Sequence, residues 1–256
     1  MDESKEVQDM QRRVTFSNPE GLSLVGIIHT PPQAKDIGII LCHGFTGSKN
    51  RNFIPILADE FALYGYTTLR FDFSGNEESE GKFEDRTYTK YIEDLRMTIT
   101  YFRKYVSRIC IVGHSMGGAI AILEYNRYKD YNACVLLAPG IILQRDFFTM
   151  KQKEQLRMSR YLDFTAWGKP YRLKQEYFTD RKRYDLLEEG KKIPLPTLLL
   201  IGEKDTVVSI DACKEVAQHN KSIILKIIPE EDHIFHNKTN TMLKHIIPFL
   251  ASLPLQ

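Results

Sequence analysis

The segment Gly113-His114-Ser115-Met116-Gly117 places a serine between two glycines, after an apolar run and before a stretch of small residues. A serine at a sharp strand-to-helix turn takes a strained backbone conformation that projects its hydroxyl outward. Side chains two positions before and after the serine would collide, so Gly113 and Gly117 supply the necessary room. The pattern predicts an exposed nucleophilic hydroxyl on Ser115. The alternative is a serine that only caps the following helix.

A serine hydroxyl is a weak nucleophile near neutral pH, so it needs a general base, and the base needs an orienting carboxylate. On an elbow of this kind, the acid and then the base follow the serine at the ends of later strands. Asp205 follows the apolar run at 196–202, and His233 follows the run at 222–228. We therefore predict a triad of Ser115, Asp205 and His233.

Three nearby residues could replace the predicted acid and base. Glu203 and Asp232 are the alternative acids, but Glu203 directly abuts its strand and Asp232 directly precedes the histidine. His236 is the alternative base and is expected to enter the last helix. If the predicted pair has no catalytic role, Asp205 caps a helix and His233 is a solvated loop residue. Three histidines away from strand ends are expected at the surface or in packing: His29, His219 and His245.

Acyl transfer also requires donors for a developing oxyanion. One predicted donor is the backbone N–H of Met116, directly after the serine. The second is the N–H of Phe45 in the loop at 43–47, where Gly44 allows a close approach of the backbone. Because the donors are main-chain groups, we expect the side chains of Phe45 and Met116 to matter less than their positions. We expect His43 to brace this loop, since it comes too early in the chain to be the base.

The elements that must position these residues alternate along the chain. A turn signal, Asn18-Pro19-Glu20-Gly21, predicts a hairpin over residues 12–32. Beyond it, apolar runs predict strands, and amphipathic segments between them predict helices over 53–66, 87–105 and after Ser115. The predicted strands lie at 37–44, 67–73, 108–113, 133–139, 196–202 and 222–228. This alternation predicts an α/β fold with a mostly parallel sheet covered by helices on both faces. In such sheets ligands bind at the carboxyl ends of the strands.

Residues 140–193 interrupt the alternation, because they contain no convincing buried strand. They hold nine aromatic residues, among them the only tryptophan, Trp167, and 13 lysines and arginines against eight acidic residues. We expect this segment to be a helical cap over the active face, inserted into a core formed by residues 1–139 and 194–256. The alternative is a helical excursion remote from any site.

Composition narrows the class of protein. The 256 residues are 43% hydrophobic and 27% charged, and the net charge of +2 is too small to indicate a nucleic-acid partner. No apolar run approaches the roughly 20 residues that span a bilayer, so we expect no stable membrane insertion, and the charged start lacks the apolar region of a secretory signal.

Widely spaced cysteines indicate buried free thiols in a reducing, cytoplasmic compartment: Cys42, Cys110, Cys134 and Cys213. A homo-oligomer is compatible with the sequence, which does not define an oligomeric state.

Five motifs resemble, in this order, those of the α/β-hydrolase superfamily: "HGFTG" at 43–47, "FDFSGNEESEGKFED" at 71–85, "GHSMGG" at 113–118, "GEKDTVV" at 202–208 and "EEDHIF" at 230–235. The narrower resemblance is to cinnamoyl and feruloyl esterases, with their relatives among acylglycerol lipases and general carboxylesterases. It covers the chain from about residue 12 to its end. One loop departs from the family, which usually has Gly-x-Gly where this chain has Gly75-Asn76-Glu77.

The resemblance implies a serine carboxylic-ester hydrolase that acts on a small-molecule ester through an acyl-enzyme, with no metal and no cofactor. Thioester hydrolysis, carbon–carbon bond cleavage and perhydrolysis use the same triad, and a non-catalytic ligand receptor could keep the fold. A membrane-associated lipase would need an exposed apolar cap face. The aromatic cap indicates aryl or medium-length apolar acyl groups. Its basic excess indicates either carboxylate-bearing substrates or a solvated surface.

Overall fold

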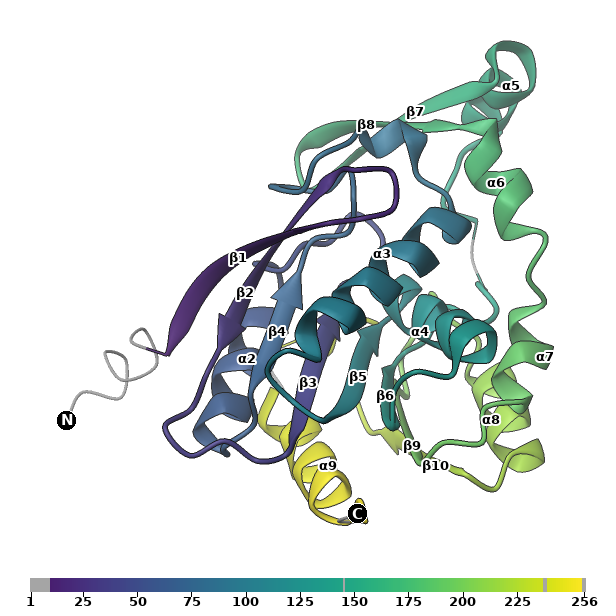
Figure 1. Ribbon diagram of the computed structural model, residues 1–256. Helices are drawn as coiled ribbons and strands as arrows, with labels where there is room; N and C mark the ends of the chain where they lie inside the picture. Colours follow the sequence, from purple (N-terminus) through teal and green to yellow (C-terminus); the bar gives the residue numbers. More distant parts are fainter. Residues whose placement is uncertain (1–9, 145, 237–238, 255–256) are drawn as a thin grey trace.

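The computed structural model describes residues 10–144, 146–236 and 239–254. Eight of its strands form one sheet: β1 (Gln11–Ser17), β2 (Ser23–His29), β3 (Ile37–Cys42), β4 (Thr68–Phe71), β5 (Arg108–His114), β6 (Ala133–Leu137), β9 (Thr197–Gly202) and β10 (Ile223–Ile228). Their spatial order is β1-β2-β4-β3-β5-β6-β9-β10 (Figure 1). β1 pairs antiparallel with β2 and β2 with β4, whereas all later neighbours are parallel. The predicted mostly parallel sheet is confirmed.

Strand burial follows from the apolar runs in the sequence. Every residue of β3, β6 and β9 is buried, as expected for parallel strands covered on both faces. The hairpin turn is held by the Asn18 side chain, whose Oδ1 accepts from the N–H groups of Glu20 and Leu22, both at 3.0 Å. Gly21 supplies the positive φ of 79° that this turn requires.

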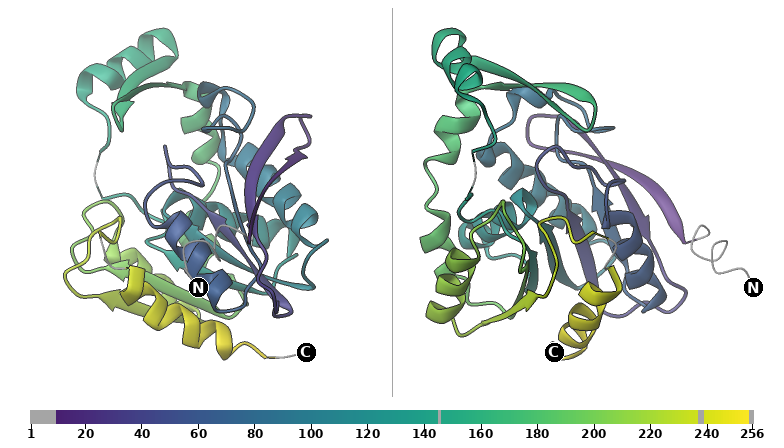
Figure 2. Two further views of the ribbon diagram at one scale, coloured as in Figure 1. Left: turned by 90° about the vertical axis from the view of Figure 1, so that its left-hand side faces the viewer. Right: turned by 180° about the vertical axis from the view of Figure 1, so that it is seen from behind.

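Helices cover both faces of the sheet (Figures 1 and 2). α3 (Tyr88–Phe102) and α4 (Met116–Tyr128) pack together on one face, and α7 (Leu186–Lys191) and α8 (Ile210–His219) lie beyond α4. α2 (Ile54–Leu63) and α9 (Thr239–Ala251) pack together on the other face. α3 begins where the Thr87 hydroxyl accepts from the Lys90 N–H, and its apolar positions three and four apart form the buried side.

The inserted segment 140–193 is only partly helical. It contains α5 (Met150–Ser159), α6 (Gln175–Arg181) and α7, but also an antiparallel hairpin of β7 (Tyr161–Ala166) and β8 (Lys169–Lys174). The expected helical character is thus only partly present, and the sequence did not predict the hairpin because it lacks an apolar run. Its one buried cross-strand pair is Leu162 with Leu173, and charged residues alternate around it. Trp167 and Gly168 form the turn with φ values of 54° and 70°, as in tight hairpins.

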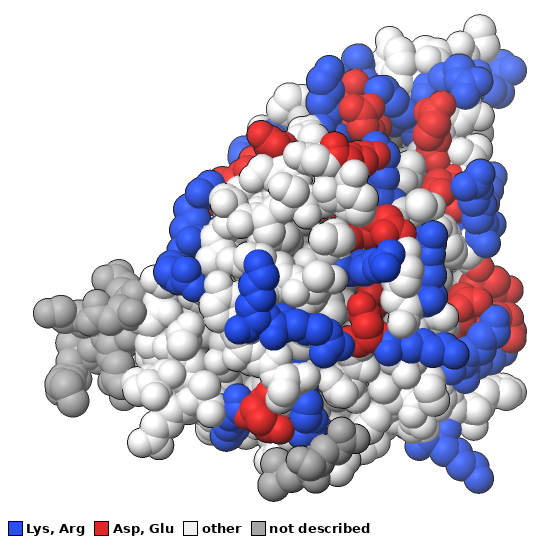
Figure 3. Space-filling view, in the orientation of Figure 1, with Lys and Arg blue, Asp and Glu red and all other residues white. Residues whose placement is uncertain are grey.

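Surface charges on this segment are mixed in sign. Basic and acidic side chains alternate over α5 and the hairpin at the top of Figure 3. Several are ion-paired: Arg157 with Glu154, Arg172 with Asp163 and Arg160 with Glu176. These pairs join residues within the segment and leave its basic excess in place, while Lys174 pairs with Asp85 outside it. In the described ranges, no helix combines the length and apolar character needed to cross a membrane.

All four cysteines are buried and free, in agreement with the predicted buried thiols. Burial raises the pKa of the Cys134 and Cys213 thiols to about 12. Because the thiolate is the reactive form, these cysteines are packing residues with little reactivity near neutral pH.

Glu124 on α4 is expected to make the stability of the protein depend on pH. Its side chain is fully buried, and neither oxygen accepts a hydrogen bond from the described residues. Burial and then the neighbouring Asp130 carboxyl raise the pKa of Glu124 to about 9. An unfolded glutamate titrates near about 4.3, so the folded chain keeps a proton that the unfolded chain loses. The free energy of unfolding should therefore fall as the pH rises from about 4.3 to about 9.

Urea unfolding at about pH 6 and about pH 8.5 measures the slope of the free energy of unfolding against pH. Glu124→Gln is neutral at both pH values and should flatten it. Glu188→Gln, which changes an exposed carboxyl, is the matched control and should leave the slope unchanged. A slope as steep in Glu124→Gln as in the wild type would contradict the prediction.

Candidate active site

Ser115, Asp205 and His233 come together from three loops at the carboxyl ends of the sheet strands. His233 Nε2 lies 3.0 Å from Ser115 Oγ, and His233 Nδ1 lies 2.8 Å from Asp205 Oδ2. The imidazole can thus accept the serine proton at one nitrogen while its other N–H donates to the carboxylate. This is the arrangement in which a histidine activates a serine hydroxyl.

The turn that carries Ser115 is strained in the way the glycine pattern predicts. Ser115 has φ 51° and ψ −115°, a region that non-glycine residues rarely occupy. Its backbone is held there because its N–H donates to Leu137 O and its carbonyl accepts from the Gly140 N–H, both at 2.9 Å. A Cβ added to Gly117 would lie 2.5 Å from the carbonyl oxygen of Cys42. No larger residue fits at that position without moving the backbone.

Asp205 is oriented and kept ionised by its surroundings. Its Oδ1 accepts from the N–H groups of Val207 at 2.7 Å and Val208 at 2.9 Å, which leaves Oδ2 for His233. Burial by itself would raise the pKa of Asp205. The hydrogen bonds from His233, Val208 and Val207 outweigh it, and the pKa lies below its usual value of 3.8. The carboxylate is therefore charged at neutral pH and fixed toward the imidazole.

The alternative acids and base lie outside this arrangement. His236 and Asp232 pair with each other at 2.8 Å, and their side chains are 67% and 44% exposed. Glu203 accepts from the Glu230 N–H through its Oε2 at 3.2 Å. Of the candidates, only Asp205 contacts the histidine that reaches the serine.

Both predicted oxyanion donors line the same cavity as Ser115 and His233. Met116 is the first residue of α4, so its N–H belongs to the free amino end of the helix. Within the described ranges, the N–H groups of Phe45 and Met116 donate to no acceptor. Gly44 lies close against the nucleophile, since a Cβ there would be 3.3 Å from Ser115 Cβ.

His43 braces the loop that carries Phe45. Its Nδ1–H donates to Gly44 O at 2.8 Å, and its Nε2 accepts from the Phe73 N–H at 3.2 Å. Burial, chiefly, lowers the pKa of His43 to about 4, so the ring is neutral and keeps this tautomer. The hydrogen bond from Phe73 thereby links the loop after β3 to the segment that follows β4.

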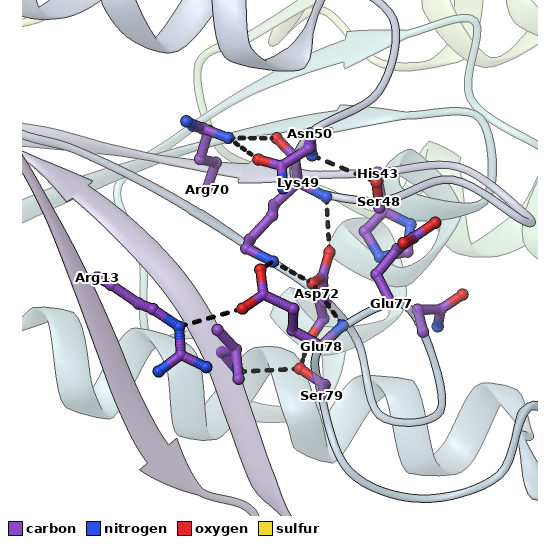
Figure 4. A network of polar contacts seen from close by, with 12 residues as sticks. Arg13, His43, Ser48, Lys49, Asn50, Arg70, Asp72, Glu77, Glu78 and Ser79 are labelled. Atoms are coloured by element: carbon purple, nitrogen blue, oxygen red, sulfur yellow. Dashed lines mark hydrogen bonds and ion pairs between the residues drawn. The ribbon is translucent and has the colours of Figure 1, made fainter. Parts of the chain in front are cut away.

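A buried ion-pair network, which was not predicted, reinforces the same loop (Figure 4). Lys49 has no exposed side-chain surface, and its Nζ lies 2.6 Å from Asp72 Oδ2 and 2.5 Å from Glu78 Oε1. The Lys49 N–H also donates to Asp72 Oδ1 at 2.7 Å, and Arg70 donates to the Lys49 carbonyl at 2.9 Å. Removing one partner would leave a buried charge unpaired, so the network holds this loop strongly in place.

A cavity of about 530 Å³ opens beside Ser115, and residues of the inserted segment form part of its lining. Its aromatic lining from that segment comprises Phe147, Phe148, Phe164, Trp167, Tyr177 and Phe178. The Phe45 ring stacks on Phe164 at 5.8 Å between centroids and contacts Tyr177 at 5.7 Å. The side chain of Phe45 therefore has a positional role that the sequence did not indicate. It joins the predicted oxyanion loop to the insertion.

The tip of the β7–β8 hairpin contacts the same loop. Trp167 donates its indole N–H to Thr46 Oγ1 at 3.1 Å, and the Arg51 guanidinium lies 5.5 Å from the Trp167 ring. Arg51 in turn pairs at 2.7 Å with Glu77, which also lies 3.7 Å from Lys169 of β8. Glu77 stands in the loop that departs from Gly-x-Gly and has a positive φ of 40°. A positive φ is unfavourable for glutamate, whereas glycine adopts it without strain. The ion pairs of Glu77 with Arg51 and Lys169 stabilise this conformation.

Comparisons with known proteins identify the family and the fold. The family model described as "Serine aminopeptidase, S33" matches residues 33–182, more than half of the chain. "Putative esterase/lipase 2" of Mycoplasma pneumoniae is 28% identical over 231 residues, which cover 80% of this chain and 85% of that protein. The mitochondrial palmitoyl-protein thioesterase ABHD10 of Bos taurus is 22% identical and covers 82% of this chain and 71% of its own.

Among solved structures, Est1E from Butyrivibrio proteoclasticus with ferulic acid bound superposes with a TM-score of 0.80. It is 22% identical and covers 94% of this chain and 98% of its own. The Pyrococcus furiosus esterase Pf2001 gives a TM-score of 0.72 at 21% identity, over 96% and 92% of the two chains. At these identities the likeness concerns the fold.

Proposed function

The chain belongs to the serine aminopeptidase S33 family and is an ester hydrolase with the α/β-hydrolase fold; from that premise we propose that it works through an acyl-enzyme on Ser115. The observation that carries the proposal is the single imidazole of His233, which bridges Ser115 Oγ at 3.0 Å and Asp205 Oδ2 at 2.8 Å.

The reaction then follows from the geometry. Ser115 Oγ attacks the ester carbonyl while His233 Nε2 takes its proton, and Asp205 stabilises the imidazolium that results. The N–H groups of Phe45 and Met116 hold the carbonyl oxygen as it becomes an oxyanion. His233 then protonates the departing alcohol. A water molecule, deprotonated by the same imidazole, releases the acid and restores Ser115.

Labelling with a fluorophosphonate tests the proposal directly. An activated serine displaces the fluoride and forms a stable covalent adduct, so intact-mass spectrometry of the wild type should show one adduct. The Ser115→Ala variant should show none. A folded wild-type protein that takes up no label, or a variant that still takes it up, would overturn the assignment.

The cavity lining supports esters with an aryl or medium-length apolar acyl group. Phe164 and Tyr177 present aromatic surface to the cavity, and burying an aromatic acyl group there should favour it by about 10- to 100-fold in kcat/KM over acetate. Phe164→Ala should reduce this preference by about tenfold. The measurement is kcat/KM for matched phenylpropanoyl and acetyl esters of one alcohol.

Phe16→Ala is the matched control for this prediction. It also removes a partly buried ring, but one that stacks on Tyr101, away from the cavity. Its ratio of kcat/KM values should equal that of the wild type. Equal kcat/KM for both esters in the wild type would contradict an aromatic acyl site.

Thioester hydrolysis is the second candidate, because one relative is named as a palmitoyl-protein thioesterase. The same nucleophile and oxyanion donors would serve a thioester, since the leaving thiolate needs little protonation. Comparing oxygen and thiol esters of the same acyl group discriminates between the two. The ratio of kcat/KM values is first corrected for the greater intrinsic reactivity of the thioester. A corrected kcat/KM that is about 100-fold higher for the thioester than for the oxygen ester would favour this candidate.

A further inference from the structure

Arg86 is a fully buried arginine next to the predicted oxyanion loop. It directly follows the short 3-10 helix η1 (Phe83–Asp85), and only 2% of its surface is exposed. Its guanidinium carbon lies 5.4 Å from the centroid of the Phe45 ring, within the range of a cation–π contact. Arg86 is not among the residues that line the cavity.

No carboxylate pairs with Arg86 among the described residues, and its guanidinium instead lies over the ring of Phe83 and near that of Tyr91. Its Nε donates to the Phe83 carbonyl at 2.8 Å and its Nη2 to Asn76 Oδ1 at 3.2 Å, and both acceptors are neutral. Its Nη1 donates to nothing in that part of the chain. The same region of the fold does neutralise another buried cation, since Lys49 is enclosed by Asp72 and Glu78.

A buried cation held by neutral acceptors and aromatic rings, with no carboxylate, is incompletely compensated in the resting protein. Burial, chiefly, lowers the pKa of Arg86 to about 10, so the guanidinium still carries its charge at neutral pH. Its field reaches the loop that carries Phe45, because the charge of Arg86 contributes, after burial, to lowering the pKa of His43. A complementary negative charge would appear beside Phe45 only when an ester carbonyl becomes an oxyanion.

Phe45 is held between this cation and the insertion. Arg86 contacts its ring from one side, and Phe164 and Tyr177 pack against it from the inserted segment. The ring cannot turn without losing these contacts, which restrain the segment of backbone that carries the Phe45 N–H. Orientation and electrostatics therefore act on the same donor.

We propose that Arg86 is a positioning residue for the oxyanion loop, whose buried charge, without a carboxylate partner, holds Phe45 and stabilises the transition state more than the bound ester. The inference rests on the proposed function, since it needs Phe45 to be an oxyanion donor. It assigns a role in catalysis to a residue that does not touch the substrate.

Two substitutions separate charge from packing. Arg86→Gln keeps hydrogen-bond donors without the charge, and Arg86→Lys keeps the charge without the planar guanidinium. We expect Arg86→Gln to lower kcat by about 10- to 100-fold with KM within about twofold of the wild type. Arg86→Lys should recover most of that loss. Arg96→Gln, which removes a half-exposed arginine paired with Glu93, is the matched control and should change neither constant.

An aryl boronic acid gives a readout of oxyanion stabilisation that does not depend on turnover. It adds to Ser115 as an anionic tetrahedral adduct, so its affinity should weaken in Arg86→Gln by the same factor as kcat. The affinity of the neutral alcohol product should stay the same. Circular dichroism verifies folding, and Arg86→Met is the second neutral variant if Arg86→Gln does not fold.

Two results would overturn the inference. One is a folded neutral variant with kcat and boronic-acid affinity within about twofold of the wild type. The other is an Arg86→Lys variant as defective as Arg86→Gln, because the charge would then be irrelevant. A wild-type protein that neither turns over esters nor binds the boronic acid would instead contradict the proposed function itself.

Discussion

Ser115→Ala is expected to lower kcat for ester hydrolysis by about a millionfold while the protein stays folded. The hydroxyl is the atom that attacks, and no other described side chain lies within hydrogen-bond distance of His233 Nε2. Alanine keeps the Cβ that the turn already accommodates, so the melting temperature should change little. Steady-state kinetics with a chromogenic ester and a thermal melt measure the two effects.

His236→Ala is the control for a general loss of activity. This histidine is exposed and paired with Asp232, so its removal should leave kcat within about twofold of the wild type. Activity of Ser115→Ala within about tenfold of the wild type would mean that another group attacks the ester. The proposed mechanism would then be wrong.

Asp205→Asn is expected to lower kcat by about 10,000-fold. An amide at this position cannot stabilise the imidazolium, and its N–H₂ group would favour the wrong tautomer of His233. The substitution is nearly isosteric, so Val207 and Val208 can still donate to the remaining oxygen. Asp232→Asn, at the exposed carboxylate, should retain activity within about twofold of the wild type, and equal losses in both variants would contradict the assignment.

The pH dependence of stability gives a second test of the ionised state of Asp205. Because the folded-state pKa of Asp205 lies below its ordinary value of 3.8, the ionised carboxylate stabilises the folded chain above that value. This contribution is lost as the pH falls through the folded-state pKa. The difference in melting temperature between the wild type and Asp205→Asn should therefore shrink on acidification below about pH 4.

The sheet and the location of the site were predictable because their signals are local or follow chain order. Apolar runs alternating with amphipathic segments predict parallel strands and covering helices without any knowledge of contacts. The glycines around Ser115 predict its turn, and the order of strand ends places Asp205 and His233 in the correct loops. The structure then brings all three side chains within hydrogen-bond distance.

The parts that were not predicted depend on contacts between distant segments. In the sequence, Lys49 follows a loop with two glycines and Asp72 stands at the end of a strand, and nothing indicates that the two pair. Only folding brings them together. The packing of Phe45 against Phe164 joins residues more than a hundred positions apart. Arg86 stands in a charged, turn-like stretch that gives no sign of burial.

The hairpin of the insertion escaped detection for a different reason. Strand prediction relies on alternating or continuous apolar residues, and β7 and β8 are half-exposed with charged residues between their apolar ones. The remaining signal was the turn at Trp167 and Gly168, which is weak without flanking apolar strands.

The contact between Trp167 and Thr46 gives the protein an internal optical reporter. Trp167 is the only tryptophan in the chain, it lines the cavity, and its indole N–H is hydrogen-bonded to the loop that carries Phe45. Tryptophan emission therefore originates from a single ring at the boundary between the insertion and the predicted oxyanion loop. Binding of an acyl group, or separation of the hairpin tip from the core, would alter the emission of that one ring, so the state of the active site can be followed in unlabelled protein.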